Sequence, residues 1–262
     1  MAAEAGPGDL SGRVALVTGG SSGIGRAVSL ALSARKARVA AVGRSRDRLD
    51  QVARQGEGIT AVLVSLDEPD GCAQAVAQAR LIGPVTILVH AAGLGGYLNR
   101  PIWQETSQAW RAMLAVNLDA AFELTRLASA DMMEARWGRI VMIGSTAGEI
   151  GAPAMSAYSA SKAGLLGLVR SAAHDLGPYG VTVNAVVPGW VRGTLMAERD
   201  AELEAARRGI TAEAVWAQRA ASYPAGRVLS TAEVAAVVSF LVSDSASGMS
   251  GAAISVTLGG IW

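Results

Sequence analysis

Short apolar runs alternate with helical stretches along the chain, and this alternation constrains the fold more than any other feature of the sequence. The runs begin at Val14, Ala37, Ile59, Val85, Gly138, Val181 and Ala252. Most are apolar throughout rather than at every second residue, which is typical of strands in a parallel sheet covered on both faces. We therefore predict an α/β fold, a doubly wound parallel sheet of about seven strands with helices on both faces.

The length of the chain favours one domain. At 262 residues it can bury a full core, and α/β domains of this size are common as single units. We predict a flexible N-terminal tail over residues 1–9 and a single domain over residues 10–262. Amphipathic helix patterns interrupt the alternation after the sixth predicted strand. They predict a helical lid over residues 190–225 that walls a substrate site, and the alternative is two surface helices packed into the core.

A glycine cluster, GGSSGIG, follows the first predicted strand directly and precedes a helical pattern. Gly19, Gly23 and Gly25 have the spacing G-x-x-x-G-x-G, which differs from the G-x-G-x-x-G of the common dinucleotide fingerprint. The physical logic is the same, because a glycine backbone can approach a pyrophosphate at the N-terminus of the following helix. The cluster predicts a Rossmann-type dinucleotide site, and an ordinary tight turn is the alternative.

The residues after the second predicted strand bear on which dinucleotide binds. An acidic residue there would bind the ribose hydroxyls of NAD, but Gly43 is followed by Arg44, Ser45 and Arg46. Guanidinium groups form paired, charge-assisted hydrogen bonds to phosphate oxygens. We therefore expect NADP(H) to be preferred through its 2′-phosphate, with NAD(H) as the alternative. A solvated basic helix start would explain the same residues without a ligand.

The stretch from Gly144 to Gly164 brings Ser145, Tyr158 and Lys162 into one short run. Tyr158 and Lys162 are four residues apart, so on a helix they lie on the same face. A phenol and an ammonium on one face can both act on one reacting group. Ser145 ends the fifth predicted strand, where ligands of an open parallel sheet bind. The run predicts a site that moves a proton, whereas an isolated Tyr-x-x-x-Lys is usually a solvated helix face.

Two polar residues fall within apolar surroundings. Asn117 lies in a helix that we predict from about Gln104 to Arg136, and a buried amide there is either a structural bridge to the backbone or part of a polar relay. His90 ends the fourth predicted strand. His174 is the only other histidine, and no ligand cluster accompanies either one, so we expect a structural role for His90 and no metal site.

The composition argues against several kinds of partner. The formal net charge is +1 and no long basic run occurs, so we expect neither nucleic acid nor an anionic membrane surface as a partner. The apolar runs are shorter than the roughly 18 residues of a membrane helix. A single cysteine, Cys72, excludes an internal disulfide, and the N-terminus has no signal pattern. A cytoplasmic location is the resulting expectation.

The span from about Leu10 to Trp262 resembles the classical short-chain dehydrogenase/reductase family. The resemblance rests on TGGSSGIG, HAAG at 90–93, Asn117, Ser145, YSASK at 158–162 and PGWVRGT at 188–194. It implies an NAD(P)-dependent oxidoreductase that transfers hydride between a nicotinamide and a ketone or secondary alcohol. Tyr158 would be the general acid and base, and Lys162 would hold the nicotinamide ribose and lower the pKa of the phenol. Ser145 would steady the carbonyl oxygen, and Asn117 would support a water relay.

The cofactor residues that the motifs assign are Gly19, Ser21, Ser22, Gly23, Ile24, Arg44, Ser45, Leu66, Ala92, Gly93, Tyr158, Lys162, Pro188, Gly189, Val191 and Thr194. Among the departures from the family pattern, two bear on the cofactor. Ser65 stands where an acidic residue often contacts adenine, and Ser22 stands where many NADP-using members carry a basic residue. Selection of the phosphate is therefore left to Arg44, with Arg46 as a candidate helper.

The predicted substrate wall is largely apolar, which favours an apolar ketone, cyclic and aromatic ones included. Its residues are Leu94, Tyr97, Ile150, Met155, Trp190, Met196 and Trp216. As an alternative, Arg192 would receive a carboxylate, as in a 3-hydroxy acid or 3-oxoacyl type of dehydrogenase/reductase. A more distant alternative is a non-catalytic NADP(H)-binding sensor. The resemblance also implies a homotetramer, or a homodimer, packed through the helices that hold Asn117 and Tyr158.

Overall fold

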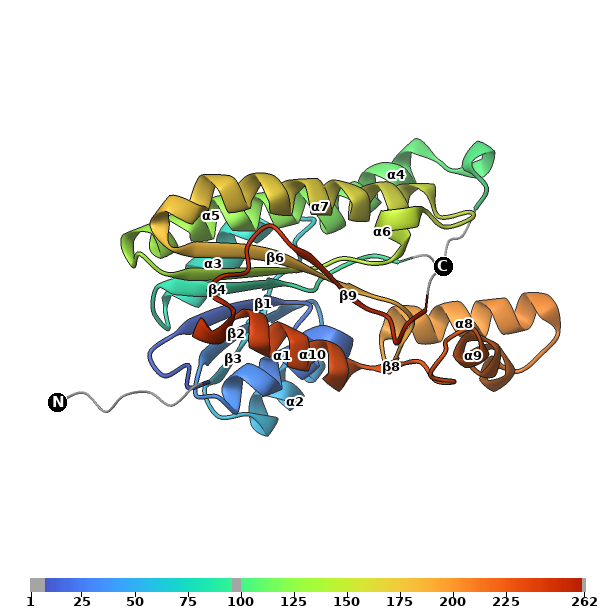
Figure 1. Cartoon of the computed structure of the whole chain (residues 1–262), viewed down its shortest axis with the longest axis horizontal. Helices are drawn as coiled ribbons and strands as arrows, with labels where there is room; N and C mark the ends of the chain where they lie inside the picture. Colours follow the sequence, from blue (N-terminus) through green and yellow to red (C-terminus); the bar gives the residue numbers. More distant parts are fainter. Residues whose placement is uncertain (1–7, 96–99, 261–262) are drawn as a thin grey trace.

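One parallel sheet organises the molecule. The computed structural model describes residues 8–95 and 100–260, and its main sheet has the strand order β3-β2-β1-β4-β5-β6-β9 (Figure 1). The strands are β1 Val14–Thr18, β2 Arg38–Gly43, β3 Ile59–Leu63, β4 Val85–His90, β5 Gly138–Ile143, β6 Val181–Pro188 and β9 Ala253–Val256. The order of connection reverses between β1 and β4, and ligands of such sheets bind outside the carboxyl ends at this point. The predicted Rossmann-type fold is confirmed, including its seventh strand.

Helices cover both faces of this sheet. Figure 1 shows α1, α2 and α10 below it and α3, α5 and α7 above it. The helices are α1 Gly23–Ser33, α2 Arg46–Gln55, α3 Gly71–Arg80, α5 Ala120–Glu134, α7 Ser156–Leu176 and α10 Thr231–Leu241. Short turns of helix lie at η2 Ile102–Gln104, α6 Ala147–Ile150, η4 Gly177–Tyr179 and η5 Asp244–Ala246. Among the described residues, none of the helices has the length and apolar character needed to cross a membrane.

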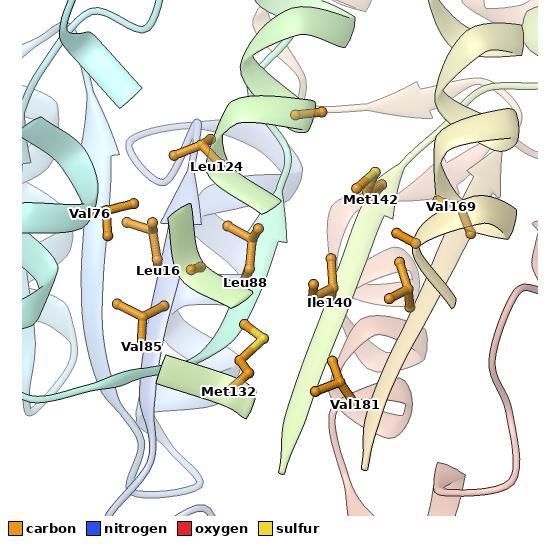
Figure 2. Packing of buried hydrophobic residues seen from close by; sticks show 14 of the residues in the cluster. Leu16, Val76, Val85, Leu88, Leu124, Met132, Ile140, Met142, Val169 and Val181 are labelled. Carbon is orange, nitrogen blue, oxygen red and sulfur yellow. The ribbon is translucent and has the colours of Figure 1, made fainter. Parts of the chain in front are cut away.

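A buried layer of side chains lies between the sheet and the helices on one of its faces. Figure 2 shows Leu16 of β1 and Leu88 of β4 between Leu124 and Met132 of α5, and Val76 of α3 closes the same layer. All five side chains are at most 1% exposed. Burial of one such side chain contributes about 1.5–3 kcal/mol, so the layer holds the strands in a fixed register. The loops at the ends of these strands therefore start from a fixed platform.

The helix that the sequence predicts from Gln104 to Arg136 contains a π turn in the structure. It consists of α4 Ser107–Leu114, a π-helical turn Ala115–Asp119, and then α5. A π turn inserts one extra residue into the helix, and such turns occur frequently at functional sites. Here the inserted turn carries Asn117, whose side chain is fully buried. The predicted helix is present as a continuous helical run from Ser107 to Glu134, and only the π turn within it was missed, because apolar periodicity does not register one additional residue.

A helical segment follows β6, as predicted. It contains β7 Val191–Arg192, α8 Leu195–Arg208, α9 Ala212–Ala221 and β8 Leu229–Ser230, and β7 pairs with β8 in a second, two-stranded sheet. Each helix starts at a threonine N-cap: Thr194 Oγ1 accepts from Ala197 N at 3.2 Å, and Thr211 Oγ1 accepts from Ala214 N at 3.1 Å. Gly209 ends α8 with a left-handed φ of 65°. The predicted N-terminal tail lies largely outside the described residues.

Candidate active site

A cavity of about 660 Å³ opens at the carboxyl ends of the strands. It extends from the glycine turn after β1, past the ends of β2 and β3, to the start of α7 and the lid helix α8. Every residue that the motifs assign to the cofactor lines it: Gly19, Ser21, Ser22, Gly23, Ile24, Arg44, Ser45, Leu66, Ala92, Gly93, Tyr158, Lys162, Pro188, Gly189, Val191 and Thr194. One cavity therefore joins the predicted cofactor residues to the predicted acid/base residue.

The glycine turn packs too closely for side chains. Gly19 has a φ of 66°, and a Cβ there would lie 2.9 Å from the backbone nitrogen of Ala92. A Cβ on Gly25 would lie 2.2 Å from the carbonyl oxygen of Gly19. The turn leads directly into the N-terminus of α1, whose unpaired N–H groups and dipole favour an anion. The residues present therefore fit the pyrophosphate of a dinucleotide.

The end of the cavity near β2 is basic. Arg44, Ser45 and Arg48 line it, whereas Arg46 does not and lies 3.9 Å from Asp50 on the exposed side of α2. The sequence interpretation missed Arg48, although its spacing of four residues from Arg44 was a usable signal. Asp67 also lines the cavity, and a hydrogen bond from Ser65 lowers the pKa of its carboxyl, with Arg44 adding to the effect.

Ser145, Tyr158 and Lys162 converge on the wall formed by β5 and α7. Ser145 follows β5 by two residues, and its hydroxyl lies near enough to the Tyr158 phenol to lower the pKa of that group. Ser145 Oγ also accepts from Ala147 N at 3.2 Å, which fixes the hydroxyl. Lys162 lies one turn further along α7, and its Nζ is 5.8 Å from the centre of the Tyr158 ring. Tyr158 and Lys162 are both buried, at 6% and 4% exposed.

Burial governs the ionisation of this pair. It raises the pKa of the Tyr158 phenol, and the Ser145 hydroxyl opposes that rise. Burial also lowers the pKa of Lys162 to about 8. The Lys162 ammonium donates to the carbonyl oxygen of Ile143 at 2.7 Å, at the end of β5. Burial therefore sets the direction of the phenol pKa in this structure, and the lowering by Lys162 that the family resemblance implies stays a prediction.

Asn117 acts as a bridge between three elements. Its Oδ1 accepts from Leu94 N at 2.8 Å, and its Nδ2 donates to Leu94 O at 3.1 Å and to Ser161 Oγ at 3.0 Å. The amide thus ties the loop after β4 to α7, one residue before Lys162. Asn117 does not itself line the cavity. Of the two readings of this buried amide, the structure shows the bridge.

His90 contacts Thr18, the residue that precedes the glycine turn. Its Nδ1 lies 3.1 Å from Thr18 Oγ1, and the same hydroxyl accepts from the backbone N–H groups of Ala91 and Ala92. Complete burial lowers the pKa of His90 to about 3, so the ring is neutral. Across the part of the chain that the structure describes, no three histidine, cysteine or acidic side chains gather where they could hold a metal ion.

The predicted substrate wall is brought together in part. Leu94, Ile150, Met155, Trp190 and Met196 line the cavity. Tyr97 lies outside the described residues. Trp216 does not line the cavity, contrary to the prediction, because the indole is 2% exposed between α8 and α9 and donates to Glu198 Oε2 at 3.0 Å.

Other residues of the lid also differ from expectation. Arg192 is not on the wall, and instead forms a two-bonded ion pair with Glu213 at 3.0 and 2.6 Å. Leu195, Arg199 and Asp200 of α8 do line the cavity, and the sequence interpretation missed all three. Their positions follow from the angle of α8, which no local sequence signal specifies.

Comparisons with known proteins agree with this geometry. A family model for short chain dehydrogenases matches residues 13–205. The chain is 36% identical over 261 residues to a protein named as ketoacyl reductase 1 of the granaticin polyketide synthase of Streptomyces violaceoruber, covering 97% of this chain and 95% of that one. It is 32% identical over 256 residues to the 3-oxoacyl-acyl-carrier-protein reductase FabG of Escherichia coli, covering 96% and 98% of the two chains.

A solved structure gives the same result. The structure is assigned as an NAD(P)-dependent gluconate 5-dehydrogenase from Beutenbergia cavernae with NADP bound at low occupancy. It superposes on this chain with a TM-score of 0.85 at 34% identity, and covers 97% of this chain and 98% of its own. The chain therefore belongs to the classical short-chain dehydrogenase/reductase family and is an NAD(P)-dependent oxidoreductase of the kind that acts on CH–OH groups.

Proposed function

We propose that the protein is an NADP(H)-dependent ketoreductase, or secondary-alcohol dehydrogenase in reverse, in which Tyr158 is the acid and base. The observation that carries the proposal is that Ser145, Tyr158 and Lys162 line one cavity together with the glycine turn and Arg44. A bound NADP(H) would supply or accept the hydride. Side chains of the protein would transfer the proton and orient the carbonyl.

Each side chain near the carbonyl has its own role in the proposed reaction. The Tyr158 hydroxyl, buried and protonated, donates its proton to the oxygen as the ketone is reduced. Ser145 donates to the same oxygen and fixes its position, since Ala147 N orients the serine. Lys162, anchored on Ile143 O, provides a cation near the phenol that favours its ionised form when the reaction runs toward the ketone. Asn117 holds the start of the substrate loop and α7 in register.

NADP(H) is the preferred cofactor in this proposal, and NAD(H) is the alternative. Arg44, Ser45 and Arg48 support the preference, because two guanidinium groups and a hydroxyl on one wall suit a ribose phosphate. Asp67 on the same wall pairs electrostatically with Arg44 and limits how much positive charge the site presents.

The substrate is proposed to be an apolar ketone, cyclic and aromatic ketones included. Leu94, Ile150, Met155, Trp190 and Met196 support this, since they make the wall apolar. The alternative, a 3-oxoacyl or 3-hydroxy acid substrate, is favoured by the names of the relatives. Recognition of a carboxylate by Arg192 loses support, because its guanidinium is engaged by Glu213.

The deciding experiment measures loss of NADPH absorbance with a panel of ketones that includes α-tetralone and ethyl acetoacetate. We expect turnover of at least one, and a loss of about 100-fold or more in kcat for Tyr158→Phe. Tyr179→Phe is the matched control, since Tyr179 is exposed on η4. Near-normal turnover by Tyr158→Phe would show that Tyr158 is not the acid and base. Tight binding of NADPH without turnover of any ketone in the panel would favour a non-catalytic sensor.

We also propose a cytoplasmic homotetramer, with a homodimer as the alternative. Trp103, Trp110 and Phe122 support a partner subunit on the α4–α5 side, because these large apolar side chains are 80%, 37% and 49% exposed. Light scattering coupled to size exclusion measures the assembly directly, and a monomer at micromolar concentration would rule it out.

A further inference from the structure

An arginine lies between two tryptophan rings inside the lid. The guanidinium carbon of Arg219, on α9, lies 3.7 Å from the centre of the Trp190 ring and 5.0 Å from that of Trp216. The two indoles meet edge to face, with centres 6.5 Å apart and planes at 88°. The contact with Trp190 is at stacking distance, so the arginine covers one side of that ring.

Three groups of α8 hold the guanidinium in this place. Arg219 donates to Asp200 Oδ2 at 2.6 Å, to Glu204 Oε2 at 2.9 Å and to the carbonyl oxygen of Ala197 at 3.4 Å. Arg219 and Asp200 are each 7% exposed. A buried charge is tolerated where it is paired and hydrogen-bonded, and this one satisfies both conditions. The planar, forked guanidinium can make these bonds and stack at the same time, which an ammonium cannot do.

Trp190 is also fixed through its backbone. It follows β6 by two residues, its N–H donates to Tyr223 Oη at 2.6 Å, and its carbonyl oxygen accepts from Leu229 N at 3.0 Å. Of the two indoles, only Trp190 lines the cavity. Backbone bonds fix where the residue is, while the orientation of the ring depends on what packs against its face. Among the described residues, Arg219 is a charged group that packs on that face.

We propose that Arg219 is a positioning residue that holds the Trp190 indole against the cavity and so sets how tightly the substrate is held. The inference rests on the proposed function, because it takes the apolar part of the cavity as the substrate site. Asp200 and Glu204 keep the guanidinium stacked, and Trp216 meets Trp190 edge to face beside it. Arg219 itself does not reach the cavity wall, so it acts on the substrate only through Trp190.

The competing explanation is that Arg219 is only an ion-pair link between α8 and α9. Arg219→Lys separates the two, since lysine keeps a charge for Asp200 and Glu204 but loses the planar stack on Trp190. If Arg219 is only an ion-pair link, Arg219→Lys should match the wild type both in its thermal midpoint and in the orientation of the Trp190 indole. Positioning predicts that Arg219→Lys folds with a thermal midpoint near that of the wild type and still fails to orient the indole.

The first measurement is independent of activity. It uses fluorine NMR of the full chain labelled with fluorotryptophan, with the Trp190 signal assigned from Trp190→Phe. We expect the Trp190 signal to shift and broaden in Arg219→Lys and Arg219→Gln. Arg208→Gln is the matched control, because Arg208 also pairs with Glu204 and links α8 to Gln218 of α9 without contacting Trp190. An unshifted Trp190 signal in Arg219→Lys would overturn the proposal, whatever ketone the enzyme reduces.

The second measurement is a double-mutant cycle on KM for the best ketone of the panel. Arg219→Lys should raise KM roughly three- to tenfold with little change in kcat, which is the size of a lost cation–π contact. In the Trp190→Ala background, the same substitution should leave KM unchanged, because the ring it orients is gone. Additive effects on KM would contradict the proposal. If no panel ketone is reduced, the proposed function fails while the NMR result still decides the role of Arg219.

Discussion

The ammonium of Lys162 donates to the carbonyl oxygen of Ile143 at 2.7 Å, so the cation that serves the acid/base residue is anchored on the last residue of β5. The anchor fixes the position of the charge relative to Tyr158. It also keeps a lysine with 4% exposure inside the protein, where burial lowers its pKa to about 8. A charge held in this way serves the reaction at the expense of stability.

Lys162→Met should therefore raise stability while it abolishes turnover. The pKa of Lys162 is about 8 in the fold against 10.5 for a free lysine, so the unfolded chain binds the proton more strongly. The buried charge of Lys162 therefore destabilises the fold to its full extent below pH 8. This effect disappears as the pH rises from 8 to 10.5. Allowing for the lost hydrogen bond, we expect roughly 1–2 kcal/mol of added stability below pH 8, fading toward pH 10.5.

Urea unfolding of the cofactor-free protein across this pH range measures the effect. Lys36→Met is the control, because Lys36 is an exposed lysine that pairs with Asp9 on the surface. A Lys162→Met variant that is less stable than the wild type at every pH would show that the anchored ammonium stabilises the fold.

Ser145→Ala should shift the pH dependence of alcohol oxidation. Oxidation needs the ionised phenol, and the Ser145 hydroxyl is what opposes the rise in the pKa of Tyr158 that burial causes. Without the serine, the pKa of the phenol rises further, so the rising limb of the pH–rate profile moves to higher pH. We also expect kcat to fall about 100-fold or more, as for loss of an oxyanion donor.

Ser156→Ala controls for removal of a hydroxyl near the start of α7. The Ser156 Oγ atom is buried and has no hydrogen-bond partner among the described residues. It should leave the pH profile unchanged. A profile in Ser145→Ala that keeps its midpoint while kcat falls would mean that the serine acts on the substrate oxygen and not on Tyr158.

Arg44→Ser and Arg48→Gln should each weaken the preference for NADPH. Both side chains line the basic end of the cavity, and each charge-assisted bond to a phosphate is worth about 1.5–3 kcal/mol. We expect the KM for NADPH to rise roughly tenfold or more, with little change for NADH. Arg46→Gln is the matched control, since Arg46 points away from the cavity wall toward Asp50. If Arg46→Gln raises the KM for NADPH as much as Arg44→Ser does, the effect comes from the overall positive charge of this region and not from contacts with the phosphate.

The sequence predicts the parts of this site that depend on local rules. The glycine turn at Gly19, the sheet and the four-residue spacing of Tyr158 and Lys162 follow from backbone geometry and periodicity, and the cavity contains them as expected. The π turn at Asn117 was missed because one extra residue leaves the apolar pattern almost unchanged. The burial of Trp216 was missed because it depends on how α8 packs on α9.

The ionisation of Tyr158 was also beyond the sequence. A motif gives the neighbours of a phenol, whereas its pKa depends on how much water the folded walls exclude. Arg48 lies on α2 and Arg199 and Asp200 lie on α8, and all three reach the cavity through the way these helices pack at its rim. Apart from Arg48, whose four-residue spacing from Arg44 was a usable local signal, these misses concern the packing of elements distant in the chain, for which a single sequence has no local signal.

Gly148→Ala should disable the site by displacing α7. A Cβ on Gly148 would lie 2.7 Å from the backbone carbonyl carbon of Lys162 and 2.8 Å from its Cβ, so backbone must shift. The shift would move the lysine off Ile143 and change the distance between Tyr158 and Ser145. Gly167→Ala is the control, because a Cβ at that position on α7 meets nothing within 4 Å among the described residues. Alanine there should stabilise the helix by about 0.5–1 kcal/mol and leave kcat unchanged. We expect Gly148→Ala to lower both the thermal midpoint and kcat, and normal kinetics in a folded Gly148→Ala would show that α6 and α7 can separate without harm to the reaction.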